Sequence, residues 1–180
     1  MKVGVNIEVK DMFYNIVQAI RAKPGYTAIP QLPNFYYGYW PEVANILAIK
    51  SQNSYAFPAI ILHANIPDKA GADYRYSKEI SPSIYIVSQT KPTYSGIDRI
   101  ENIYKPILYP IYERLIQEVK NSKYFNLIEN GREIVPHNVS DLLYLNSEAK
   151  NQNKLNDFVD AIEVKFDSLK VYKKQIFKIK

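Results

Sequence analysis

The stretch DRIENIYKPILYPIYERLIQEVKNSKYF, residues 98–125, carries the longest helical pattern in the sequence and decides the fold. Apolar side chains recur in it at every fourth position, and Leu108 and Tyr112 widen the row. The positions that form this stripe are Ile103, Ile107, Ile111, Leu115 and Val119. Such spacing places one continuous apolar face along a helix. A helix buries such a face against another layer, so the rest of the chain is expected to supply a sheet.

Two prolines interrupt this helical stretch. Asp98, with Glu101 three residues later, is typical of a helix start, because a short acceptor side chain satisfies the first free N–H groups. Pro106 and Pro110 each lack an N–H donor, and a proline inside a helix displaces the preceding turn. We therefore expect a kink or restart near Pro106 and a main helix over 107–121. Pro110 then falls within the first turn, where its missing donor costs little.

The remaining elements alternate between helical and extended patterns. Residues 10–22 form an amphipathic helix that ends at Lys23-Pro24-Gly25, and Pro41 begins a second short helix. The apolar run at Phe57 and the alternating residues 80–90 predict two antiparallel strands joined by a polar hairpin or loop over 68–78. Residues 159–172 predict a further strand with a bulge at Asp167-Ser168.

Weaker patterns fill the rest of the chain. An edge strand is expected around residues 35–39, a turn at Asn130-Gly131, and a short element over 141–145. The predicted fold class is α+β, a mostly antiparallel sheet packed against two or three helices. No repeat or low-complexity linker divides the chain, so we expect one structural domain over 1–180, with a basic C-terminal strand or tail at 170–180.

The composition excludes several classes of protein. The chain has no cysteine, which removes disulfide frameworks, thiolate zinc sites and a cysteine nucleophile. No apolar run approaches the ~20 residues that span a bilayer. Glu8 and Asp11 lie where a targeting segment would be apolar, so we expect synthesis in a cytoplasm and no membrane association. The net charge of +5 favours solubility more than it indicates a nucleic-acid partner.

No catalytic pattern is present in the sequence. His63 lies in an apolar strand, where a core or edge hydrogen bond is the favoured role, and His137 lies in a loop beside Pro136, where a solvated side chain is the default. Asp157, Asp160 and Glu163 are spaced by threes, and we interpret them as a solvated strand edge rather than a metal site. No phosphate-binding glycine loop or metalloprotease motif occurs. We expect no enzyme activity, no metal and no cofactor.

Tyrosine is unusually frequent, with 16 residues. An AT-rich coding bias explains this as well as a function does, since Ile, Asn and Lys are also common. The functional alternative is a surface buried on assembly, which suits an apolar ring with a hydroxyl. The FYYGYW cluster could stack bases, but no basic residue lies between Lys23 and Lys50, so a protein interface is favoured. The interface candidates are Phe35, Tyr36, Tyr37, Tyr39, Trp40, Tyr104 and Tyr109.

The C-terminus is rich in lysine. Lys170, Lys173, Lys174, Lys178 and Lys180 are candidates for contact with phosphates in a lumen or with an acidic partner. The alternative, a solvated tail or a charged edge strand that discourages aggregation, is favoured.

Several stretches, taken in order, resemble a known family. They are YYGYWPEVANIL, FPAIIL, IYIVSQT, ENIYKPILYPIYERLIQEVKNSKYF and VDAIEVKFDSLKVY. Together they are similar to small structural proteins of tailed bacteriophages of Bacteroides-type hosts, including neck and tail ring proteins of crAss-like phages. Those proteins resemble tail-terminator or tail-completion proteins. The resemblance covers about residues 35–172, and it implies a sheet packed on helices, ring assembly and no catalytic residues.

The expected function is therefore a virion structural protein of a tailed phage. It would assemble in the host cytoplasm into a homo-oligomeric ring in the neck or tail, joining the portal or connector to the tail. Its partners would be further copies of itself and other neck, tail or portal-proximal proteins, with nonspecific contact to channel DNA. Tyr104, Tyr109 and Glu113 on a kinked helix would face outward as subunit contacts. The alternative is a nucleic-acid-binding accessory protein that uses the basic tail.

Overall fold

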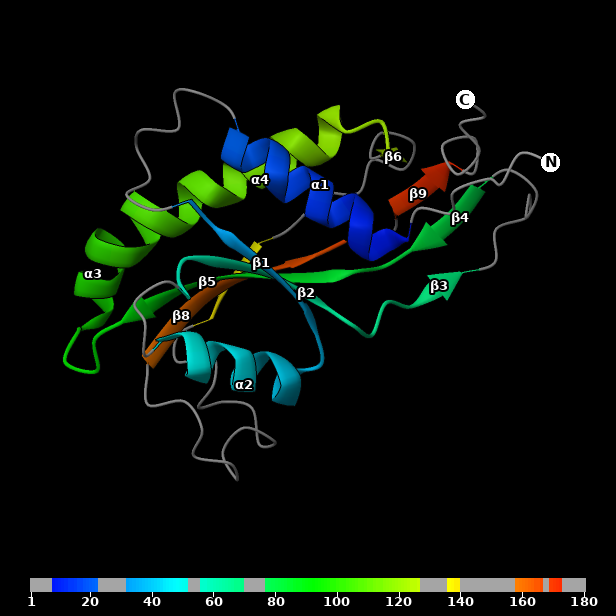
Figure 1. Ribbon diagram of the computed structural model, residues 1–180. Helices are drawn as coiled ribbons and strands as arrows, with labels where there is room; N and C mark the ends of the chain where they lie inside the picture. The colour runs from blue at the N-terminus through cyan, green and yellow to red at the C-terminus, as the bar shows by residue number, and fades with distance from the viewer. Residues whose placement is uncertain are drawn as a thin grey trace.

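The computed structural model describes residues 8–22, 32–51, 56–69, 77–126, 136–139, 158–166 and 169–172. Two sheets form its centre (Figure 1). The large sheet has the strand order β1-β2-β5-β8-β7, with bounds Asn34–Gly38, Ala59–His63, Ser83–Thr90, Phe158–Lys165 and Pro136–Val139. Only β1 and β2 run parallel, and the other described neighbours are antiparallel. The predicted antiparallel pairing of the Phe57 run with residues 80–90 is confirmed.

The small sheet extends the large one along two of its strands. Its order is β3-β4-β9-β6, with bounds Asp68–Lys69, Ser77–Ile80, Leu169–Tyr172 and Phe125–Asn126. Ser81 and Pro82 separate β4 from β5. Ile80 is paired with Leu169, and Ser83 is paired with Lys165. The bulge predicted at Asp167-Ser168 lies outside the described residues.

Helices cover both faces of the large sheet. They are α1 Val9–Ala22, α2 Trp40–Ser51, α3 Gly96–Arg99, a π-helix (η1) Ile100–Leu108, and α4 Tyr109–Asn121. Helices α1 and α4 lie on one side of the sheet and α2 on the other (Figure 1). The α+β class, a mostly antiparallel sheet packed against helices, is confirmed.

Alternation along the strands sends apolar side chains into two cores. Ile84 and Ile86 of β5 pack with α1 and with the stripe of α4. Val87 joins Val43 and Leu47 of α2 on the opposite face. An alternating strand with one face in water would leave Val87 exposed, whereas here both sides of the strand are buried.

The long helix differs from its prediction around Pro106. Residues 96–121 form one continuous helix, and the predicted kink is replaced by a π-helical stretch, in which the Tyr109 N–H donates to the Tyr104 carbonyl five residues back. A proline ring clashes with the carbonyl four residues earlier in an α-helix, and the wider π turn relieves that clash. Pro110 lies in the first turn of α4, as predicted.

The widened turn also rotates the side chains that precede α4. Leu108 is fully buried and Tyr104 is only 3% exposed, while Ile107 is half-buried. The prediction that Tyr104 faces outward is therefore wrong, because it assumed the four-residue period of an α-helix throughout. The hydroxyl of Tyr104 points to the sheet and donates to the Ala161 carbonyl at 3.4 Å.

Two further predictions need correction. The helix starts at Ser95 rather than at Asp98, which is instead the partner of Ser95 in a capping box. His137 was expected in a loop, and it lies in strand β7, paired in register with Glu163. The turn at Asn130-Gly131 and the element over 141–145 lie outside the described residues.

Candidate assembly surface

Four aromatic rings gather where the parallel strands β1 and β2 end. We call Tyr39, Trp40, His63 and Tyr85, together with the carboxylate of Glu163, the aromatic surface. The Trp40 ring lies 4.7 Å from that of Tyr85 and 6.2 Å from that of His63, between centroids. The Tyr39 ring meets His63 edge-on at 5.9 Å. Tyr39 is 53% exposed and the others are half-buried, so the cluster is held by its own packing while facing solvent.

The chain reaches this position through a glycine and a helix cap. Gly38 has a φ of +157°, and a Cβ there would lie 2.8 Å from Glu42 Oε2. Glycine tolerates both the conformation and the close approach. Glu42 Oε2 accepts a hydrogen bond from the Tyr39 N–H at 3.1 Å, which satisfies a donor at the start of α2. Tyr39 and Trp40 are thereby fixed at the turn from β1 into α2.

Two members of the aromatic surface form a cross-strand pair. Tyr85 of β5 lies opposite Glu163 of β8, and its hydroxyl donates to Glu163 Oε1 at 2.5 Å. The other carboxylate oxygen lies 3.1 Å from Lys165 Nζ. Burial, and then the hydrogen bond and charge of Glu163, raise the pKa of the Tyr85 hydroxyl. Tyr85 therefore stays a neutral donor at physiological pH.

His63 was expected to be held by a hydrogen bond. Among the described residues, its side chain instead contacts the rings of Tyr39 and Trp40. Part of the imidazole remains accessible. Its surroundings are those of a packing and contact residue.

A second surface lies at the start of the long helix, which we call the capped corner, residues 94–100. Ser95 Oγ accepts from the Asp98 N–H at 3.2 Å, and Asp98 Oδ2 accepts from the Ser95 N–H at 3.0 Å. Asp98 Oδ2 also accepts a hydrogen bond from the Ser95 hydroxyl at 2.8 Å, and this bond, followed by the one from the Ser95 N–H, lowers the pKa of the Asp98 carboxyl. The corner presents two isoleucines to solvent, since Ile97 is 74% exposed and Ile100 42%.

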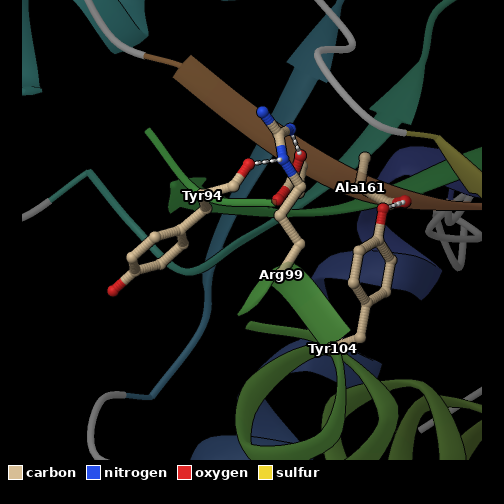
Figure 2. A network of polar contacts seen from close by, with 5 residues as sticks. Tyr94, Arg99, Tyr104 and Ala161 are labelled. Carbon is tan, nitrogen blue, oxygen red and sulfur yellow. Dashed lines mark hydrogen bonds and ion pairs between the residues drawn. The ribbon is translucent and has the colours of Figure 1, made fainter. Parts of the chain in front are cut away.

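A buried ion pair attaches the capped corner to the sheet. The Arg99 guanidinium lies between the Tyr94 carbonyl and the carboxylate of Asp160 (Figure 2), with Nε at 3.3 Å from the carbonyl and Nη1 at 2.6 Å from Oδ1. Asp160 is fully buried. The expectation that Asp160 forms part of a solvated edge is therefore wrong, because Arg99 compensates its charge inside the protein.

The structure separates the predicted interface residues. Tyr36 is buried against α2, and Tyr104 is buried under the long helix, so neither side chain is available to a partner. Phe35 and Tyr109 are half-buried against the opposite core. Tyr37 is exposed on the α1 face, because neighbouring strand residues point to opposite sides. Of the seven candidates, Tyr39 and Trp40 alone belong to the aromatic surface.

The aromatic surface also contains residues that the sequence did not identify as interface candidates. His63, Tyr85 and Glu163 come from β2, β5 and β8, and their proximity depends on the antiparallel registers that join these three strands. Ile97 and Ile100 of the capped corner were missed as well. The exposure of Ile97 could have been predicted from the sequence, since it is an apolar residue outside the stripe of the long helix.

The basic C-terminal residues are mostly outside the described part of the chain. Lys170 lies in β9, half-buried and in register with Glu79 and Asn126. Lys173, Lys174, Lys178 and Lys180 lie beyond the last described residue, Tyr172.

Within the described ranges, no cluster of His, Asp or Glu is suited to a metal ion, and none of the helices is both long and apolar enough to cross a membrane. Compared with protein-family models and with curated proteins, the chain gives no match.

Proposed function

We propose that this protein is a structural subunit that assembles with copies of itself into a ring in the neck or tail of a tailed phage, joining the portal to the tail. One observation carries the self-assembly part of the proposal: the half-buried aromatic surface of Tyr39, Trp40, His63 and Tyr85.

The physical chemistry of this surface suits a protein contact. Tyrosine and tryptophan are enriched in interface cores because each buries a large area with few rotatable bonds. Trp40 is packed against Tyr85 and His63, so little side-chain freedom is left to lose on binding. Tyr39 keeps more than half of its surface in water, and that area is available to a partner.

A ring needs two different surfaces on each subunit, since head-to-tail contacts join unlike patches. The capped corner is the second candidate. Ile97 and Ile100 are exposed on a helix start that the Ser95 cap and the Arg99–Asp160 ion pair hold in place. It is joined to the sheet at Asp160, which points to the same face as Ile162 of the α1 and α4 core, whereas Tyr85 and Glu163 point to the α2 face. Both surfaces are thus partly apolar and held by their own contacts, and they are separate.

The phage neck or tail as the place of assembly rests on the sequence resemblance over residues 35–172. The α+β fold, with a sheet packed on helices, agrees with what that resemblance implies.

Size-exclusion chromatography with light scattering tests the proposal, together with electron microscopy of the purified protein. We expect a discrete oligomer of many subunits and ring-shaped particles. A strict monomer at high protein concentration, with no assembly when phage tail components are added, would contradict it. Tight, salt-sensitive DNA binding by that monomer would favour the nucleic-acid alternative instead.

A further inference from the structure

We infer that the aromatic surface receives the basic C-terminal segment, residues 173–180, of a second copy of this chain. The inference rests on the proposed self-assembly and names the segment that this surface binds. It follows from the chemistry of the surface, the composition of the segment, and the direction in which β9 leaves the fold.

The aromatic surface is suited to cations attached to apolar side chains. The faces of tryptophan and tyrosine rings attract ammonium groups, most strongly at partly desolvated sites. Two carboxylates lie at this surface, Glu163 beneath the Tyr85 hydroxyl and Glu42 beside Tyr39, whereas Lys165 is the single cation that the structure pairs with them. The local charge is therefore negative on a protein whose net charge is +5.

The C-terminal segment has the complementary composition. Its sequence KKQIFKIK combines four lysines with Ile176, Phe177 and Ile179. In an extended conformation, Phe177 and Ile179 lie on one side and Lys178 and Lys180 on the other. Such a strand can set apolar side chains against the rings and ammonium groups against the carboxylates or the ring faces.

The direction of β9 favours the surface of a neighbour over that of the same copy. The aromatic surface lies at the Ser83 end of the large sheet, because Ile61 and Leu62 pair with Tyr85 and Ile84. Strand β9 leaves that end, running from Leu169 opposite Ile80 to Tyr172 opposite Ser77. Returning over these strand positions takes about 20 Å, or about six residues, plus a reversing turn of about two more. A path from Tyr172 back to the aromatic surface of the same copy therefore takes about eight residues, as many as the segment 173–180 contains. The lysines before the last one cannot reach these rings in their own copy.

Trp40 is the only tryptophan in the sequence, so its fluorescence reports on this surface alone. The experiment mixes two full-length variants. The receiver keeps Trp40 but carries Lys173→Gln, Lys174→Gln, Lys178→Gln and Lys180→Gln. The donor keeps the basic segment but carries Trp40→Phe and is invisible to the measurement.

We expect the receiver's fluorescence to change saturably as donor is added, and the change to disappear when the donor also carries the four glutamines. The receiver alone should self-associate at least tenfold more weakly than the wild type. A matched control replaces four exposed lysines elsewhere, Lys10, Lys105, Lys120 and Lys123, by glutamine and should assemble as the wild type does.

The result that overturns the inference is a receiver whose fluorescence ignores the donor although light scattering shows that the wild type forms oligomers. In that case the proposed self-assembly stands and a different segment makes the contact. A wild-type protein that stays monomeric overturns the proposed function itself. The control could also weaken assembly as much as the four glutamines in the segment do. The effect would then be one of net charge alone, and this result would count against the inference.

Discussion

The two faces of the large sheet differ in how completely they are covered. On the face toward α1 and α4, Ile60, Ile86 and Ile162 are fully buried in one continuous core. On the opposite face Val87 and Ala161 are buried under the α2 side, but His63, Tyr85 and Glu163 are only partly covered. We call the face toward α1 and α4 the closed face and the face toward α2 the open face. Burial on the closed face stabilises the fold, whereas the open face leaves large rings partly exposed to solvent. Substitutions on the closed face are therefore expected to affect stability, and substitutions of the exposed rings on the open face are expected to affect assembly.

The largest effect is expected on the closed face. Ile86→Ala should lower the free energy of unfolding by about 2–5 kcal/mol, since it leaves a cavity in a core with no solvent access. Urea denaturation followed by circular dichroism measures the loss. The fraction that remains folded should assemble normally. A loss below about 1 kcal/mol would mean that this face is less tightly packed than its burial indicates.

A somewhat smaller effect is expected at the ion pair that joins the closed face to the capped corner. Asp160→Ala leaves the Arg99 guanidinium in a largely buried site and should cost about 3 kcal/mol. Lys105→Ala is the matched control, because it breaks an exposed pair with Glu101 and should change stability by less than about 0.5 kcal/mol. Equal costs for the two variants would show that burial of the Arg99 pair has no energetic consequence.

On the open face, Tyr85→Phe should cost about 1–2 kcal/mol, because it removes a hydrogen bond to a carboxylate and leaves the ring in place. The pKa of Tyr85 is raised in the folded protein above its ordinary value of 10.0. The stability that its hydroxyl contributes is therefore fully present below pH 10 and is lost as the pH rises further. The difference between wild type and Tyr85→Phe should shrink above pH 10. A difference that grows there would contradict the assignment.

Much of this fold follows from local patterns in the sequence, because the stripe of residues 103–119 and the alternation of residues 80–90 specify a helix and a strand directly. The position of Tyr104 does not follow, since Pro106 could be accommodated by a kink or by a π turn, and the choice depends on packing against the sheet. Asp160 was assigned to solvent because its partner, Arg99, lies 61 residues away. The aromatic surface was predicted only at Tyr39 and Trp40, as its other members are adjacent only in the folded sheet.

The smallest effect on stability and the largest on assembly are expected together at Tyr39. Tyr39→Ser should change the free energy of unfolding by less than about 0.5 kcal/mol, because the side chain is exposed. Tyr14→Ser is its matched control. It makes the same change at another exposed tyrosine, on α1 beside Phe35 and on the other face of the sheet.

Light scattering after size-exclusion chromatography of the wild type, Tyr39→Ser and Tyr14→Ser, at equal protein concentrations, tests the central claim most directly. The prediction is a large oligomer for the wild type and for Tyr14→Ser, and a shift toward monomer for Tyr39→Ser with its thermal unfolding unchanged. Identical masses for all three proteins, or a loss of assembly in Tyr14→Ser alone, would contradict the claim that the open face of the sheet is where this protein meets its partner.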